Sequence, residues 1–368
     1  MITQYKLLAA MLLVALASSV FSTSSYAITA VSDHPLIKPY ANAKRNCTGL
    51  TPLPNYCRFP RYYRVQPITG LVLPAALNDV GQVVGMTVGA DHRLHAAVWS
   101  NGTVTDLGML GCRDSVSICQ SRARGINDLG QIVGDSNADD MFSPYHPHAF
   151  LWSAGAMTPL PELGPEWSSA TDINDNGVIV GYGRASFDYE EHGWVNSDGR
   201  LTPIGNSGEP SRAYAVNEKD QVAGSIRIGS SSQGFFLSNE TMTLFGGLGG
   251  PTTIAYDLND AARPNVVGVS TNAENKHRAF LWRPGVMFDL GVLPQTDTSV
   301  AWAINNRGQI VGQSGDKAVI WQNGEMRDIN HYLGTTPVTM RDAIDIDKRG
   351  NILAQGTNGA FYLLYAQY

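Results

Sequence analysis

The feature that most constrains this chain is a motif that occurs seven times. The best preserved copies read Asn-Asp-x-Gly-Gln, then Ile or Val, then Val-Gly, and the last copy replaces the first Asn by Asp. The copies are 42 to 49 residues apart, which suits one four-stranded propeller blade and is far too long for a rung of a β-helix. We therefore expect an all-β chain that folds as a seven-bladed β-propeller. The repeated residues are Asn78, Asn127, Asn174, Asn217, Asn259, Asn305 and Asp347.

A third-strand segment follows each motif. Its second position is Ala or Gly in all seven copies, and its third position is aromatic in five, as in His148-Ala149-Phe150 and Gly359-Ala360-Phe361. Neighbouring residues of a strand point to opposite faces, so we expect the small side chain to meet one adjacent blade and the aromatic ring the other. In the motif itself, Asn accepts turn hydrogen bonds and Gly supplies a positive φ.

Counting the fourth strands shows how the ring closes. Six copies occur within the repeats, for example Val104–Leu107 and Met157–Leu160, but the chain ends at Tyr368 after the seventh third strand. The segment Val65–Ile68 matches the same pattern upstream of the first repeat. We expect it to complete the last blade, which would leave no open sheet edge in the ring.

The third strands and the hairpin motifs resemble the HAF-repeat extracellular proteins, named for the tripeptide seen here as His148-Ala149-Phe150. The endings Asp106-Leu107-Gly108 and Asp289-Leu290-Gly291 are also similar to that family. The resemblance covers about residues 62 to 365 and implies export and a propeller-like repeat. It implies no activity and no catalytic residues.

The first 27 residues are typical of a secretory signal peptide. Lys6 precedes an apolar run from Leu7 to Ala17, and Ser25-Tyr26-Ala27 offers the small residues that a signal peptidase needs. The run is shorter than the roughly 20 residues that span a bilayer, although an uncleaved anchor is the alternative. We expect export, to the periplasm or the exterior, with no membrane insertion after cleavage. Residues 28–60 should form an extended or capping segment, and residues 61–368 the propeller.

The net charge of the chain bears on the class of its partners, and its cysteines bear on the compartment in which it folds. The net charge of −6 argues against a nucleic-acid partner, which would require a basic face. In an oxidising compartment the four cysteines are expected to form disulfides, and three pairings are open. Proximity in sequence favours Cys47–Cys57 together with Cys112–Cys119. Their spacings do not match a metal or redox motif.

The candidate binding surface follows from strand order. The connections from strand two to three, and from strand four to the next blade, open on one side, which we call the long-loop face. Between the motif and the third strand the seven loops hold 9, 13, 10, 8, 9, 4 and 4 residues. Binding residues usually lie on such variable loops. We therefore expect binding at blades two and three, through Asp139, Asp140, Tyr145, His146, Asp188, Tyr189, Glu190, Glu191 and His192.

These loops combine aromatic rings with carboxylates, which suits recognition of a surface glycan or of a protein. The leading interpretation is a non-catalytic binding module. The alternatives are a polysaccharide hydrolase or lyase that uses Asp140, Glu190 or Glu191 as acid and base, and a structural envelope component. Solvated loops without a function are the remaining interpretation. We expect no metal, because no ligand spacing supports one, and no cofactor.

Overall fold

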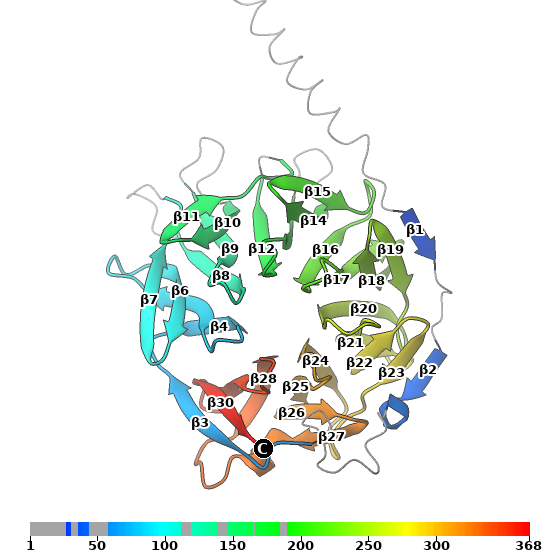
Figure 1. Ribbon diagram of the computed structural model, residues 1–368. Coiled ribbons are helices and arrows are strands. Elements are labelled where there is room, and N and C mark those ends of the chain that lie inside the picture. The colour runs from blue at the N-terminus through cyan, green and yellow to red at the C-terminus, as the bar shows by residue number, and fades with distance from the viewer. Residues whose placement is uncertain are drawn as a thin grey trace, which may run out of the picture.

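The computed structural model describes residues 27–30, 36–43, 58–111, 119–138, 146–164, 166–184 and 190–368. Seven four-stranded antiparallel units surround a central channel, and the chain is a seven-bladed β-propeller (Figure 1). The first strand of each blade lines the channel and the fourth lies outermost. Blade 1 comprises β4 (Val72–Leu77), β5 (Val83–Val88), β6 (Leu94–Ser100) and β7 (Thr103–Gly108). Blade 2 comprises β8 (Ser121–Ile126), β9 (Ile132–Asn137), β10 (Pro147–Ser153) and β11 (Ala156–Pro159). Blade 3 comprises β12 (Ser168–Ile173), β13 (Ile179–Arg184), β14 (Glu191–Ser197) and β15 (Arg200–Ile204).

The remaining blades follow the same order. A parallel bridge between Ser232 and Thr252 links blades 4 and 5 into one larger sheet. Blade 4 comprises β16 (Ser211–Val216), β17 (Val222–Ile228), β18 (Ser231–Ser238) and β19 (Thr241–Phe245), and blade 5 comprises β20 (Gly249–Leu258), β21 (Val266–Asn272), β22 (His277–Arg283) and β23 (Val286–Asp289). Blade 6 comprises β24 (Ser299–Ile304), β25 (Ile310–Ser314), β26 (Lys317–Gln322) and β27 (Glu325–Asp328), and the 3-10 helix η3 (Ile329–Tyr332) follows it. Blade 7 comprises β28 (Met340–Ile346), β29 (Ile352–Gly356), β30 (Phe361–Gln367) and β3 (Tyr62–Ile68).

The predicted closure is confirmed. β3 runs antiparallel to β30, with Val65 opposite Leu364 and Ile68 opposite Phe361. Blade 7 therefore has three strands from the C-terminal end of the chain and one from the N-terminal part, as the count of fourth strands predicts. This pairing covers the edge of β30 and gives blade 7 the same four strands as the other blades.

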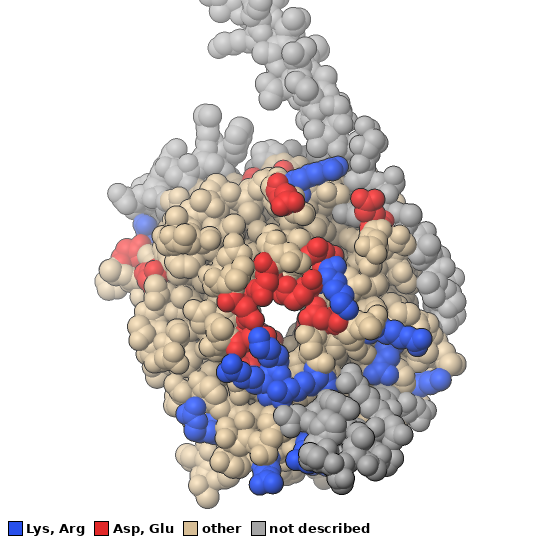
Figure 2. Space-filling model, in the orientation of Figure 1, with Lys and Arg blue, Asp and Glu red and all other residues tan. Residues whose placement is uncertain are grey.

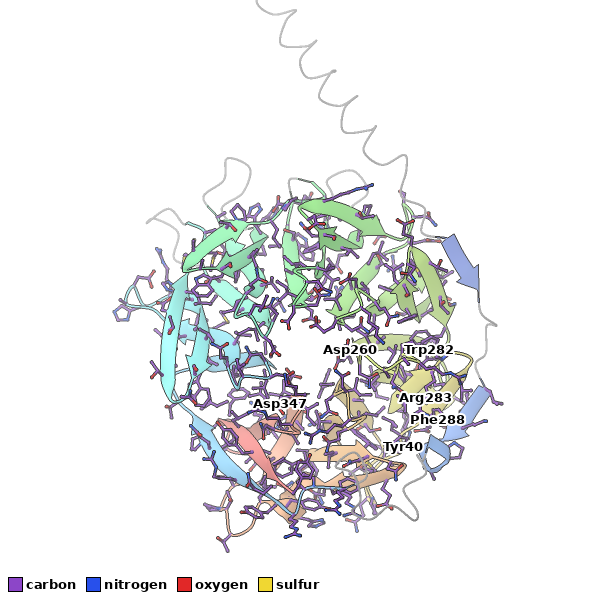
Figure 3. The ribbon with its side chains drawn as sticks, viewed as in Figure 1. Tyr40, Asp260, Trp282, Arg283, Phe288 and Asp347 are labelled. Carbon is purple, nitrogen blue, oxygen red and sulfur yellow. The ribbon has the colours of Figure 1, made fainter. Side chains whose placement is uncertain are left out.

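The two described strands that precede β3 in the chain lie on the outside of the ring. β1 (Ala27–Ala30) pairs in parallel with β19 of blade 4, and β2 (Leu36–Pro39) pairs in parallel with β23 of blade 5. The 3-10 helix η1 (Tyr40–Ala43) follows, and the Tyr40 ring is buried in the cluster that contains Phe288, on which Arg283 stacks (Figure 3). The rest of the expected signal peptide lies outside the described residues. Within the described part of the chain, no helix has the length and apolar character to cross a membrane.

The alternation of small and aromatic residues works as expected in blade 2. Phe150 packs against Val84 and Val98 of blade 1, whereas Ala149 packs against Ile173 of blade 3. The glycine that ends the motif allows this packing, because a Cβ on Gly134 would lie 1.9 Å from the carbonyl oxygen of Arg122.

The expected alignment of blade 7 is wrong by one residue. Ala354 pairs with Tyr362, whereas the equivalent Gly134 of blade 2 pairs with Phe150, so Tyr362 and not Phe361 occupies the aromatic position. Gly359 and Ala360 belong to the preceding turn, in which the Gly359 amide donates to Gly356 and φ of Gly359 is 81°. The turn uses the small residues that the strand was expected to contain.

Candidate functional site in the central channel

A β-bulge in the first strand of each blade points one side chain into the channel. The register shifts at Arg124, Thr171, Tyr214, Tyr256, Trp302 and Ile344, and blade 1 has a longer irregularity that includes Ala75. A bulge inserts one extra residue and reorients its side chain. The flanking residues remain in the core, as the fully buried Ala301 beside Trp302 shows. The bulges thus give every blade one residue on the channel wall whose identity is not set by packing in the core.

The bulge residues surround a cavity of about 460 Å³, which we call the aromatic cavity. Its wall is divided by chemistry: blades 4 to 6 contribute large rings, whereas blades 1 to 3 contribute small or polar side chains. This volume is within the usual range of small-molecule sites. The described lining residues are Ala75, Arg124, Thr171, Tyr214, Tyr256, Trp302, Asp342 and Ile344.

The rings form a continuous arc. Tyr214 and Tyr256 meet edge to face with centroids 5.5 Å apart, and Tyr256 and Trp302 lie 4.9 Å apart. The arc continues through Tyr182 to Trp167, with centroid distances of 6.4 and 5.7 Å. All five side chains are half-buried, and three of them, Tyr214, Tyr256 and Trp302, line the aromatic cavity. Burial raises the pKa of Tyr256 to about 12, so its hydroxyl stays a hydrogen-bond donor at physiological pH.

Two charged groups lie at the edges of the arc. The Asp342 carboxylate accepts a hydrogen bond of 2.9 Å from Nε1 of Trp302, and burial raises its pKa to about 6. Arg124 of blade 2 forms an ion pair with Asp135. Among the described lining residues, Asp342 is therefore the only carboxylate and Arg124 the only cation, and the charge of Arg124 is already balanced.

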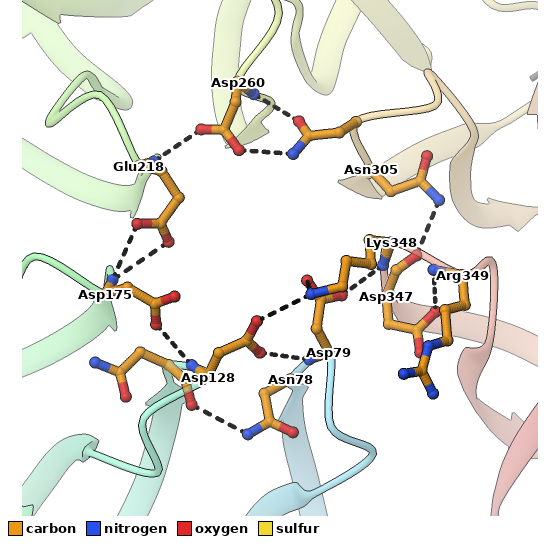
Figure 4. Close-up of polar contacts among 12 residues, drawn as sticks. Asn78, Asp79, Asp128, Asp175, Glu218, Asp260, Asn305, Asp347, Lys348 and Arg349 are labelled. Carbon is orange, nitrogen blue, oxygen red and sulfur yellow. Dashed lines mark hydrogen bonds and ion pairs between the residues drawn. The ribbon is translucent and has the colours of Figure 1, made fainter.

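The repeated asparagines connect the blades at the opposite end of the channel, the hairpin face (Figure 4). In blade 2, Nδ2 of Asn127 donates to the carbonyl of Asn174 in blade 3 at 3.0 Å, while Oδ1 accepts from the amide of Gln131 within its own turn. Six such contacts between blades, 2.8 to 3.2 Å long, run round the ring. Asp347 has no amide to donate, so this series is interrupted between blades 7 and 1.

The next residue of each motif forms a second, acidic ring around the channel mouth. The amide of Asp79 donates to Asp128, and that of Glu218 donates to Asp260, each at 2.8 Å. Lys348 of blade 7 pairs with Asp79 at 2.9 Å. Figure 2 shows the resulting arc of carboxylates around the central opening, with basic side chains beside it. The ring consists of Asp79, Asp128, Asp175, Glu218, Asp260, Asn306 and Lys348. All of these except Asp175 line a second cavity together with most of the asparagines, and in Figure 3 Asp260 and Asp347 mark two sides of this mouth.

Three further carboxylates join blades within the wall. Asp172, Asp257 and Asp345 each accept one amide from the following residue and one from the next blade, the latter at 2.9, 2.7 and 2.7 Å. Burial raises the pKa of Asp172 to about 7 and that of Asp345 to about 6, and it raises the pKa of Asp257 well above its usual value. These groups hold the inner strands together.

The structure describes only part of the predicted binding surface. Asp139, Asp140, Tyr145, Asp188 and Tyr189 lie outside the described residues. Of the cysteines only Cys119 is described; it is buried and disulfide-bonded, whereas Cys47, Cys57 and Cys112 lie outside, so the pairings stay predictions.

The described members of the predicted set take different positions. His146 directly precedes β10, and His192 lies buried within β14. Glu190 pairs with Arg227 at 3.1 Å, and Glu191 pairs with Arg212.

Arg212 links this region to the channel. Its guanidinium stacks over the Tyr182 ring, the fourth ring of the aromatic arc, at 4.8 Å. One predicted residue, Glu191, is thus connected to the aromatic arc through Arg212, although the arc itself was not predicted.

The histidines of the repeated third-strand position pair with carboxylates of their own blades. Nδ1 of His95 lies 2.9 Å from Asp106, and His148 contacts Glu162. In the described part of the chain, no group of three or more His, Cys, Asp or Glu side chains has the arrangement of a metal site.

Comparison with solved structures places the chain in the class of β-propellers. The propeller domain of the trilobed protease from Pyrococcus furiosus is similar with a TM-score of 0.50 at 9% identity, over 83% of this chain and 94% of that one. A structure described as YCF48 bound to D1 peptide has a TM-score of 0.48 at 9% identity, over 86% of this chain and 100% of that one.

The Aleuria aurantia lectin is also similar, with a TM-score of 0.38 at 11% identity, over 74% of this chain and 96% of the lectin. At such identities the similarity concerns the fold alone. No protein-family model matches the chain, and no curated protein is similar to it in sequence.

Proposed function

We propose that this chain is an exported, non-catalytic propeller that binds a glycan in the aromatic cavity. The observation that carries the proposal is the arc of five contacting, half-buried rings from Trp167 to Trp302, three of which, Tyr214, Tyr256 and Trp302, line a cavity of about 460 Å³. Aromatic rings stack on the apolar faces of sugars, and polar groups at the edges of the rings bond sugar hydroxyls. Tyr256, Thr171 and Asp342 supply such groups here.

The surroundings support binding rather than hydrolysis. Glycoside hydrolysis needs two carboxyl groups roughly 5 to 9 Å apart on either side of the scissile bond. The described lining of the aromatic cavity holds a single carboxylate, Asp342, whereas Glu190 and Glu191 are engaged by arginines. The signal-like N-terminus supports export, and the HAF-like strands support a place among exported repeat proteins.

The test is a binding assay on the purified mature protein. A glycan array would identify ligands, and isothermal titration would then compare the wild type with Tyr256→Ala. Loss of a central aromatic anchor costs about 2 kcal/mol or more, so we expect at least a thirtyfold weaker affinity. The control is Tyr62→Ala, which removes a ring that is 53% exposed on the outer edge of blade 7. Binding that Tyr256→Ala leaves unchanged, or binding of protein ligands in place of glycans, would contradict the proposal.

A further inference from the structure

We propose that the glycan bound in the aromatic cavity carries protonated amines, as in a chain of amino sugars that lack N-acetyl groups. This inference rests on the proposed function and specifies its ligand class. It combines three features of the cavity: the ring faces, the fixed carboxylate and the sign of charge along the channel.

The first feature is the group of rings from three adjacent blades. The ring centroids of Tyr214 and Tyr256 lie 5.5 Å apart and those of Tyr256 and Trp302 lie 4.9 Å apart, and all three rings line the same cavity. The face of an aromatic ring carries negative charge, so it attracts an ammonium group, and Trp does so best. Neutral sugars would stack on the same rings, so the rings alone do not distinguish the two classes.

The second feature is a carboxylate fixed beside the largest ring. Asp342 lines the cavity, and the indole N–H of Trp302 holds one of its oxygens at 2.9 Å. A carboxylate offers about four acceptor positions, and the indole and the backbone amide of Ala343 use two of them, which leaves room for an ammonium donor. Such a charge-assisted bond is about twice as strong as a neutral one, and it exists only for an amine that keeps its proton.

The third feature is the charge of the channel as a whole. Arg124 is the only cation among the described residues of the cavity lining, and Asp135 neutralises it. Towards the hairpin face follows the acidic ring, in which five carboxylates outnumber one lysine. An excess of one sign of charge along a channel concentrates the opposite sign within it. It therefore favours a cationic glycan, gives a neutral one no electrostatic attraction and repels a uronate-bearing one.

The experiment uses a matched pair of ligands and one isosteric substitution. Isothermal titration would compare a glucosamine oligomer with the N-acetylglucosamine oligomer of the same length, because the two differ only in the charge and acylation of the amine. We expect the wild type to bind the amine form at least tenfold more tightly. Asp342→Asn keeps an acceptor for Trp302 but removes the charge, so it should abolish most of this preference by weakening the amine form far more than the acetylated form.

The control is Asp198→Asn, which removes the same charge from an exposed turn where φ is 53° and Asn is well tolerated. It should keep the full preference for the amine form. If both oligomers bind equally, if the acetylated form binds more tightly, or if Asp342→Asn keeps the preference, the inference is wrong and glycan binding stands. If no glycan binds at all, the proposed function fails with it.

Discussion

The asparagine contacts between blades make a prediction that can be worked out in detail. The side chain of Asn127 makes three hydrogen bonds: its Nδ2 donates to Oε1 of Gln131 at 2.7 Å and to the carbonyl of Asn174 at 3.0 Å, and its Oδ1 accepts from the amide of Gln131. Asn127→Asp keeps the shape and the acceptor but removes both donors. A new carboxylate oxygen would then face two acceptor oxygens in a buried turn.

Blade 7 shows how the fold accommodates an aspartate at this position. The residue four positions later is Asn351, whose Nδ2 donates to Asp347 at 2.7 Å, where the consensus has a glutamine that accepts. The exchange of donor and acceptor within the turn satisfies the carboxylate. Gln131→Asn should therefore partly rescue Asn127→Asp.

The magnitudes follow from the groups left unsatisfied. Each buried polar group without a partner costs about 1–3 kcal/mol, so Asn127→Asp should destabilise the protein by about 3 kcal/mol. A hydrogen bond to a charged group contributes about 1.5–3 kcal/mol, so the double variant should recover at least about 1 kcal/mol. In a domain of this size, 1 kcal/mol shifts Tm by roughly 2 °C, which gives a fall of about 6 °C for the single variant.

Calorimetry at neutral pH would measure these shifts. Leu129→Ala is the control, because its side chain is 70% exposed at the tip of the same hairpin and should change Tm very little. If the Tm of Asn127→Asp matches that of the wild type, or if the double variant melts no higher than the single one, the side-chain hydrogen bonds of the repeated asparagine do not stabilise the contact between blades.

Two further predictions concern closure and pH. Deleting residues 62–70 exposes the edge of β30, so we expect aggregation or loss of a cooperative transition in calorimetry; an unaffected transition would rule out a stabilising role for this strand. The pKa of Asp172 is raised to about 7 on folding, so the folded protein holds a proton that the unfolded chain releases near pH 4. Its contribution to stability is thus complete at low pH and decreases by up to about 1.4 kcal/mol per pH unit as the pH rises towards 7. Urea unfolding at pH 5 and pH 8 should show this decrease, and a decrease of the same size in Asp172→Asn would argue against it.

The fold could be predicted because each blade repeats the same local chemistry. The motif of Asn127 and Gly130 specifies a hairpin in any context, and the small and aromatic positions specify which neighbour each face meets. The register of blade 7 could not be derived in the same way. Its Gly359 and Ala360 satisfy the pattern of a strand and also that of a turn, and only the pairing of Ala354 with Tyr362 decides between them.

The candidate site was missed for a different physical reason. Simple alternation along a strand gives no sign of a bulge, so Tyr214, Tyr256 and Trp302 read as ordinary first-strand residues. Their signal is positional: each stands three residues before the repeated Asn, where the equivalent residues of other blades are as different as Arg124 and Ile344. Because this position varies widely between copies while the residues on either side of it stay similar, its side chain does not pack in the core. Aligning the seven copies on the Asn column would have singled it out.

The route of the N-terminal segment has a consequence for how the molecule assembles. β3 is synthesised long before β30, and 299 residues separate Val65 from its partner Leu364. Bringing such distant segments together carries the largest entropy cost of any strand pair in the fold. β1 attaches to blade 4 and β2 to blade 5, which are made in that order before blade 7. Each attachment shortens the free chain that still separates β3 from β30, so blades 4 and 5 would bring β3 closer to its partner strand before blade 7 forms.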